Sequence, residues 1–570
     1  MKKIQFTLFV LLLSVSTGFA GKKAQLKLPK IFGDNMVLQQ NFQAPVWGWA
    51  EPGKKITTKA SWLKKKVVTR AAEDGSWNMK LQTPKAGGPY SVKIKSDTTY
   101  NFKNVLIGEV WLCSGQSNME MPVDSVRPGF GGVPNFKLEI ATANFPEIRL
   151  FTFPKTAATE PQIEVIGSWN VCCPATVPEF SAVAYFFGKE LYQRLNVPIG
   201  LMNVSWGGSA AEAWTNAENL LQFPEFKTKM EQLDSLMGNT KKNQKKYENA
   251  KAEWNQLLHS KKADDFSKLD QWMDVGFNDT SWNIIKVPHL WSHTELAGLT
   301  GSVWFRTIVN IPEKWQGKNL KLHLGPIDEM DITWFNSNRI GEHKNSSDWT
   351  KKRSYTIPAE NVLPGKNTIL LHVTNDFGEG GIYGDKKNIK ICAEDTSLKQ
   401  EINLSGEWRY KICLDYKTLP PMPQEIFRWP NQTPTLLYNG MLHPLIPFAI
   451  KGVTWYQGES NAANADLYSR LFPVMIKNWR QDWNQGDFPF YFVQIAPYNY
   501  KRNYPSGAEL RESQLKSLSV LNTGMAVTMV LGHKNDIHPR RNVEVGKRLA
   551  LWALARDYGF GDIVYSGPFY

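Results

Sequence analysis

The sequence predicts an α/β fold with two additional β-rich modules, and three patterns along its 570 residues lead to this prediction. From residue 106, strand-like and helix-like patterns alternate, which is typical of a sheet covered by helices. Residues 25–105 instead alternate apolar and polar side chains in short runs between Gly and Pro turns, which favours an antiparallel β-sandwich. Residues 265–415 repeat this short-strand pattern before the α/β pattern resumes at 425, so we expect an inserted β-domain.

The first twenty residues have the composition of a secretory signal peptide. Lys2 and Lys3 precede the apolar run 6–15, and Gly18-Phe-Ala20 provides the small residues of a cleavage site. We therefore expect cleavage after Ala20 and export to the periplasm or the extracellular space. No later apolar run in the sequence is long enough to cross a membrane, so no membrane insertion is expected.

Composition argues against several classes of protein. The net charge of +14 comes largely from lysines at 241–262 and 64–66, which we interpret as solvated surfaces, with an anionic glycan as the alternative partner and no nucleic acid expected. Five cysteines are too few for a disulfide scaffold, although Cys392 and Cys413 could pair. No His/Cys spacing predicts a metal site.

A serine on a tight turn is the first candidate for chemistry. The apolar strand that begins at Ile107 breaks into Ser114-Gly-Gln-Ser-Asn118, and a glycine-flanked turn leaves room for a base and a substrate to approach Ser117. The alternative is that Ser117 only caps a helix. In Asn535-Asp-Ile-His-Pro-Arg540, Asp536 and His538 point the same way if the segment is extended, so the carboxylate could orient the imidazole.

Two further strands end on small or polar residues. They are followed by Trp206-Gly-Gly and by Gln457-Gly-Glu-Ser-Asn461. In an open α/β sheet the carboxyl ends of the strands meet at one edge, where ligands bind. We therefore expect these segments to lie beside Ser117.

These segments resemble the SGNH hydrolases and, more closely, the sialate O-acetylesterase family of carbohydrate esterases. Gly-Gln-Ser-Asn-Met, Trp-Gly-Gly, Trp-Tyr-Gln-Gly-Glu-Ser and Asp-Ile-His-Pro occur in the family's order, and the resemblance spans roughly residues 25–570. It implies an SGNH-type α/β/α sandwich and, at 265–415, a galactose-binding-like jelly roll. The expected domains are a signal peptide (1–20), an N-terminal β-sandwich (25–105), the first part of the α/β domain (106–262), the insert (265–415) and the second part (425–570). Family members usually continue with more β-structure, so we expect a shortened version.

The resemblance also implies roles for individual residues. Ser117 is the expected nucleophile, His538 the base and Asp536 its orienting acid, with no cofactor and no metal. The superfamily's Asp-x-x-His is shortened to Asp-x-His, so a Ser-His dyad is the alternative. The backbone amide of Ser117, Gly208 and the side chain of Gln457 are the expected oxyanion hole. Asn461 is the second choice for that side chain, because the superfamily pattern at this strand is Gly-x-Asn-Asp.

The implied activity is removal of acetyl groups from an O-acetylated carbohydrate, with sialic acid as the first choice of sugar. Acetylated xylan or pectin is the rival substrate, and a non-catalytic carbohydrate-binding protein is the rival from another class. Arg511 and Gln514, one helical turn apart, and Trp206 are candidate substrate contacts, with a surface helix and core packing as the alternative readings. The oligomeric state is left open.

Overall fold

The structure is a computed structural model that describes residues 25–125, 129–237, 240–395, 400–423, 429–500 and 506–567. The expected signal peptide, residues 1–20, lies outside the described residues. Contacts divide the chain into two compact units, Met1–Gly238 with Phe427–Tyr570 and Asn239–Ile426. The second unit is thus continuous in sequence and interrupts the first. It begins earlier than expected, since the helical stretch after 239 belongs to it rather than to the α/β domain.

A mostly parallel sheet runs through the first unit in the order β25-β24-β23-β7-β10-β8-β9. Only β9 pairs antiparallel to its neighbour. The strands are β7 (Thr99–Gly115), β8 (Phe145–Thr152), β9 (Trp169–Cys172), β10 (Ile199–Ser205), β23 (Gly452–Tyr456), β24 (Phe490–Val493) and β25 (Thr523–Ala526). Val110, Val204, Val453 and Val493 thus lie on strands of one sheet.

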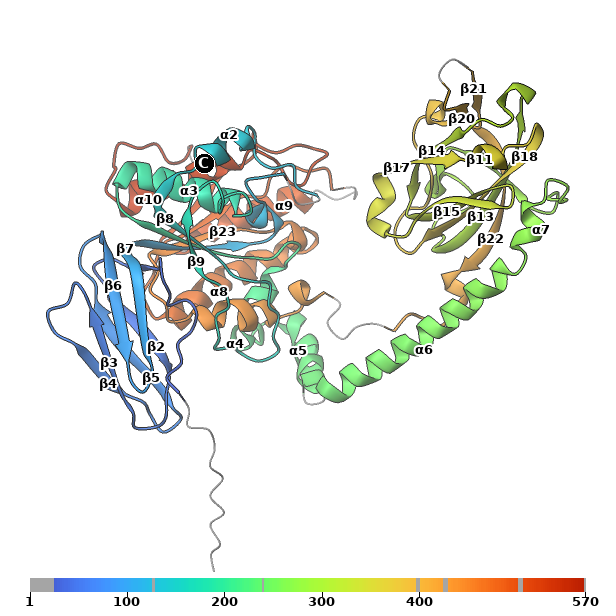
Figure 1. The fold of residues 1–570 in the computed structure, drawn as a ribbon. Coiled ribbons are helices and arrows are strands. Elements are labelled where there is room, and N and C mark those ends of the chain that lie inside the picture. The colour runs from blue at the N-terminus through green and yellow to red at the C-terminus, as the bar shows by residue number, and fades with distance from the viewer. Residues whose placement is uncertain are drawn as a thin grey trace, which may run out of the picture. The chain divides into compact units, whose positions relative to one another are not determined.

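Helices cover both faces of this sheet, which explains why its inner strands are apolar along their whole length. All seven residues of β10 are buried. Trp111 and Cys113 of β7 pack into one core, and Val110 and Leu112 pack into the core on the other face. Helices α3 and α10 lie on the first face and α8 and α9 on the second (Figure 1). Their bounds are α3 (Ala182–Leu195), α8 (Ala465–Trp483), α9 (Ser506–Lys516) and α10 (Asn542–Asp557).

Strand β7 is long because it serves two sheets. Its first half pairs with β6 in the N-terminal module, and its second half pairs with β10 and β23. The N-terminal strands are β1 (Val37–Gln39), β2 (Gln43–Trp49), β3 (Lys55–Ala60), β4 (Val67–Arg70), β5 (Ser76–Gln82) and β6 (Gly87–Lys95). The module at 25–105 therefore continues into the α/β domain through this strand and shares a core with it.

Short helices occupy the connections of the first unit. They include α1 (Ser117–Glu120), α2 (Phe136–Ala141), α4 (Ala217–Leu220), α5 (Pro224–Met237) and the 3₁₀ turns η1 (Ala211–Trp214) and η11 (Glu459–Asn464). Helix α1 follows β7 after Gln116, and η11 follows β23 after Gln457 and Gly458.

The second unit is two six-stranded sheets with an apolar core, preceded by two helices. The helices are α6 (Thr240–Phe266) and α7 (Leu269–Met273). One sheet holds β11 (Asn283–Val287), β13 (Gly301–Ile311), β15 (Met330–Phe335), β16 (Asn338–His343), β18 (Gly365–Asn375) and β22 (Gly406–Asp415). The other holds β12 (His289–Leu290), β14 (Leu320–Asp328), β17 (Lys352–Ile357), β19 (Gly381–Ile382), β20 (Ile389–Ala393) and β21 (Glu401–Asn403).

None of the five cysteines is in a disulfide, so the bond considered between Cys392 and Cys413 is not formed. Cys392 lies on β20 and Cys413 on β22, which belong to opposite sheets. Within the described part of the chain, no helix combines the length and the apolar character that a membrane span needs.

Candidate active site

Three strands of the central sheet end at the same level. Gly115, the last residue of β7, is in register with Ser205 of β10 on one side and with Tyr456 of β23 on the other. The backbone then continues the contact, because the N–H of Gln116 donates to the carbonyl of Tyr456 and the N–H of Trp206 donates to the carbonyl of Gly115. The three polar segments expected to meet at a sheet edge therefore start from adjacent positions.

Ser117 is the first residue of α1, and it is half-buried. Gly207 packs against it so closely that a Cβ on Gly207 would lie 3.4 Å from the Cβ of Ser117. Gly208 follows with φ +68, a left-handed conformation that favours glycine. Among the described residues, no acceptor engages the backbone N–H of Ser117 or of Gly208. Both groups are therefore available to an oxyanion.

Glu120 supports this turn, a role that the sequence analysis missed. Its Oε2 accepts the N–H of Gly207 at 2.6 Å, and its Oε1 lies 2.7 Å from Nζ of Lys155. Glu120 stands one helical turn after Ser117, and that spacing is the only signal the sequence offered. The buried carboxylate thus holds the Gly207 backbone beside the serine.

His538 lies half-buried on the loop before α10. Burial lowers the pKa of its imidazole, while the Asp536 carboxylate, a hydrogen bond to the Gly129 backbone and the Glu120 carboxylate act in the opposite direction. Its ring centroid is 4.9 Å from that of Phe130. A lowered pKa keeps the imidazole neutral near pH 7, which is the form that accepts a proton.

Asp536 is exposed and bonds to the backbone of His538 rather than to its ring. Its Oδ1 accepts the N–H of His538 at 2.8 Å. The Gly129 backbone lies near enough to the imidazole to raise its pKa, against the effect of burial. The carboxylate thus shapes the loop directly and acts on the imidazole through its charge.

Asn118 joins the serine turn to the histidine loop. Its Nδ2 donates to the Ile537 carbonyl at 3.1 Å, across 419 positions of sequence. Ser117 and His538 themselves are not hydrogen-bonded to each other within the described part of the chain. Such a contact is often loose without substrate and tightens when substrate binds.

Gln457 is engaged elsewhere. It is fully buried, and its Nε2 donates to the Ser209 carbonyl at 3.0 Å and to Oδ1 of Asn461 at 2.7 Å. An amide nitrogen has two hydrogens, so both are used. Asn461 is also tied down, because its Oδ1 accepts the N–H of Ala211 and its Nδ2 donates to Glu212. These bonds connect the ends of β23 and β10.

The three candidate substrate contacts differ in their availability. Gln514 is fully buried, and its amide bonds to the backbones of Ile495, Gln457 and Val493. We therefore assign Gln514 a structural role in place of the substrate contact expected from the sequence. Arg511 is half-buried with a pKa lowered by burial, opposed by Tyr500, and Trp206 is half-buried against the core.

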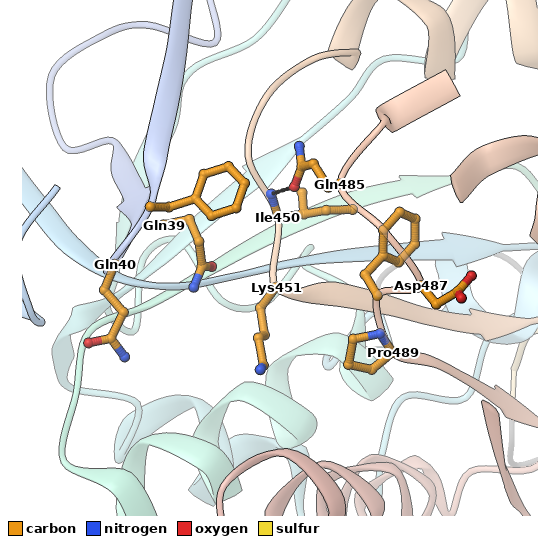
Figure 2. A pocket seen from close by; sticks show the side chains of 9 residues that line it. Gln39, Gln40, Ile450, Lys451, Gln485, Asp487 and Pro489 are labelled. Atoms are coloured by element: carbon orange, nitrogen blue, oxygen red, sulfur yellow. Dashed lines mark hydrogen bonds between the residues drawn. The ribbon is translucent and has the colours of Figure 1, made fainter. Parts of the chain in front are cut away.

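A separate pocket lies at the other end of the strands. Figure 2 shows its lining, which includes Lys451 and Pro489, the residues immediately before β23 and β24. The pocket has a volume of about 350 Å³ and contains none of the residues predicted for the site.

Comparisons with known proteins cover nearly the whole chain. A family model described as carbohydrate esterase, sialic acid-specific acetylesterase, matches residues 424–555. Mouse sialate O-acetylesterase is 25% identical over 94% of this chain and 74% of the mouse protein. The human sialate O-acetylesterase is 23% identical over 94% of this chain and 72% of its own length. The crystal structure of a carbohydrate acetylesterase from Xanthomonas citri is 25% identical, covers 95% of this chain and 77% of that chain, and superposes with a TM-score of 0.56.

The match to the family model includes two of the segments described above. Gln457 to Asn461 and Asp536 with His538 lie within it, whereas Ser117 lies outside.

Proposed function

We propose that this chain, an esterase related to the sialate O-acetylesterases, is an exported enzyme that removes acetyl groups from O-acetylated carbohydrates. The observation that carries the proposal is the position of Ser117. It follows a strand end, it lies against Gly207, and Asn118 ties its turn to the loop of His538.

The proposed chemistry begins with Ser117. Its Oγ attacks the acetyl carbonyl while His538 takes the hydroxyl proton, and the backbone N–H groups of Ser117 and Gly208 stabilise the oxyanion. The C–O bond to the sugar then breaks as His538 returns the proton to the sugar oxygen. Water, activated by His538 in the same way, attacks the acetyl-serine and releases acetate. Gln457 would add a third donor only by giving up a present bond, to Ser209 or to Asn461.

Asp536 enters this scheme as a modifier of His538. Its negative charge favours the imidazolium that forms during the reaction, whereas its hydrogen bond goes to the loop backbone. This arrangement supports a Ser-His pair assisted by Asp536 over a triad in which the carboxylate holds the ring.

An O-acetylated sialic acid is our first choice of substrate. The basic net charge, which is 14 − 2 = +12 once Lys2 and Lys3 leave with the expected signal peptide, and the half-buried Arg511 suit a sugar that carries a carboxylate. The rival substrate is acetylated xylan or acetylated pectin. It is kept because the relative from Xanthomonas citri is a carbohydrate acetylesterase.

The test is acetate release from a panel of acetylated sugars. Purified protein should release acetate from p-nitrophenyl acetate and, faster, from one of O-acetylated sialic acid, acetylated xylan or acetylated pectin. The Ser117→Ala protein is the control and should release none above background. Binding to a glycan without acetate release from any substrate would refute the esterase proposal and favour the carbohydrate-binding alternative.

Export is proposed from residues 1–20 alone. The full chain expressed in a host with a secretory pathway should yield a mature protein that begins at Gly21. N-terminal sequencing of the exported fraction measures this. A chain that keeps Met1 and stays in the cytosol would contradict it.

A further inference from the structure

Asn118 uses its whole amide nitrogen to connect two other segments. Its Nδ2 donates to Oε1 of Glu459 at 2.7 Å and to the carbonyl of Ile537 at 3.1 Å. The side chain is fully buried. Ser117 immediately precedes Asn118 in the chain, and His538 immediately follows Ile537. The two bonds therefore act next to the proposed nucleophile and the proposed base.

Glu459 presents a buried carboxylate to this amide. It is the first residue of η11, directly after β23 and Gly458. Its Oε2 is closed to solvent and has no hydrogen-bond partner among the described residues. The bond from Asn118, together with a bond from the residue's own backbone, thus fixes the direction of the carboxylate.

The carboxylate also fixes the direction of the amide. If the Asn118 amide rotated by half a turn, its oxygen would face two acceptors, Oε1 of Glu459 and the Ile537 carbonyl. Both contacts would become repulsive in a site closed to water. Glu459 therefore selects the amide orientation that holds the Ile537 carbonyl.

We propose that Glu459 and Asn118 are positioning residues for His538, which hold its loop at the Ser117 turn through the Ile537 carbonyl. The proposal rests on the esterase function proposed above. Neither residue touches the reacting atoms in this scheme. Their effect is geometric, and a displacement of about 1 Å at a reacting group can cost about 10²-fold in rate.

The ionisation of Glu459 adds a measurable signature. Burial raises the pKa of Glu459 to about 7, against the lowering effect of its hydrogen bonds to its own backbone and to Asn118. The ionised carboxylate accepts the Asn118 hydrogen more strongly than the neutral acid does. Three tyrosines interact electrostatically with Glu459: Tyr456 of β23, Tyr468 of α8 and Tyr500, which follows β24. Arg511 of α9 interacts in turn with Tyr500. The tyrosines have raised pKa values and stay neutral, so Glu459 is the member of the cluster that titrates near pH 7.

The test compares Asn118→Ala, Glu459→Gln and a matched control, Asn478→Ala. Asn478 is another fully buried asparagine, on α8, with its own side-chain hydrogen bonds away from the proposed site. Asn118→Ala should lower kcat by about 10²-fold with little change in KM. Asn478→Ala should lower the melting temperature and leave kcat unchanged. Glu459→Gln keeps an acceptor oxygen, so it should retain most of kcat but lose the step near pH 7 in the kcat profile.

A second readout needs no activity. Hydrogen exchange of the backbone amides in 533–541 should be faster in Asn118→Ala than in the wild type and the Asn478→Ala control, because the loop has lost its anchor. If the wild type proves inactive but exchange still differs, the esterase proposal fails and the anchoring survives. Unchanged exchange with unchanged kcat in Asn118→Ala would overturn the positioning role. If the pH profile of kcat in Glu459→Gln were identical to that of the wild type, the positioning role proposed for Glu459 would be overturned.

Discussion

Gly115 lies so close to the backbone of Tyr456 that a Cβ on the glycine would be 2.1 Å from the Tyr456 carbonyl oxygen. This contact lies at the point where β7 stops pairing and the turn to Ser117 begins. The φ of Gly115 is +143, a backbone angle that residues with a side chain rarely adopt. A glycine is therefore required here for two independent reasons, and the position of Ser117 depends on it.

Gly115→Ala should therefore destabilise the protein. We expect a loss of at least about 1–3 kcal/mol in the free energy of unfolding, because the overlap with backbone cannot be relieved by a side-chain rotation. Chemical denaturation measures the loss. The control is Gly486→Ala, where φ is +73 but nothing lies within 4 Å, so only the backbone conformation is penalised. Equal losses in the two variants would show that the contact with Tyr456 is unimportant.

Substitutions of the proposed nucleophile, base and acid should rank in a definite order. Ser117→Ala and His538→Ala should each lower kcat by up to about 10⁶-fold, the scale known for groups that act as one unit. Asp536→Asn should cost much less than the roughly 10⁴-fold loss of a triad whose acid holds the ring, a reference figure taken from a serine protease. The asparagine oxygen can still accept the His538 N–H. Steady-state kcat measures all three, and a 10⁴-fold loss for Asp536→Asn would restore the full triad.

The pH profile should report a low pKa for His538. Burial lowers the pKa of its imidazole below the ordinary 6.5, so the base form persists to more acidic pH. In the Glu459→Gln protein, kcat/KM should rise with pH with a midpoint below 6.5. Because the unfolded state binds this proton more readily, the contribution of His538 to stability is present above 6.5 and is lost as the pH falls below it. An ascending limb above 6.5 in that variant would contradict the burial of His538.

Gln457→Ala separates a structural role from an oxyanion role. Since both amide hydrogens bond within the protein, we expect a loss of about 1–3 kcal/mol in unfolding free energy. Removal of one oxyanion donor typically lowers kcat by roughly 10²–10³-fold, and we expect kcat of Gln457→Ala to fall by less than that. A loss of that size with unchanged stability would instead establish Gln457 as the donor first expected. Asn461→Ala is the companion variant, because Asn461 supplies the acceptor for Gln457.

The sequence by itself determined the strand ends. Ser117, Gly208 and Gln457 were predicted to follow strands because each comes after an apolar run broken by glycine, and the registers of β10, β7 and β23 place those ends together. Such patterns are readable because backbone periodicity and glycine conformations act over a few residues. The start of the second unit at residue 239 could not be predicted from the sequence, because a polar helix buries no side-chain pattern that indicates which hydrophobic core it adjoins.

The partners of the polar side chains were decided only by the tertiary structure. Gln514 and Gln457 read as site residues, yet their amides bond to backbone or to Asn461. Glu120 and Asn118 were assigned no role from the sequence, yet they hold Gly207 and Ile537. A buried polar group must find a partner wherever packing brings one within about 3 Å, and those partners lie up to hundreds of residues away in the chain. Local sequence patterns carry no information about contacts formed at that separation.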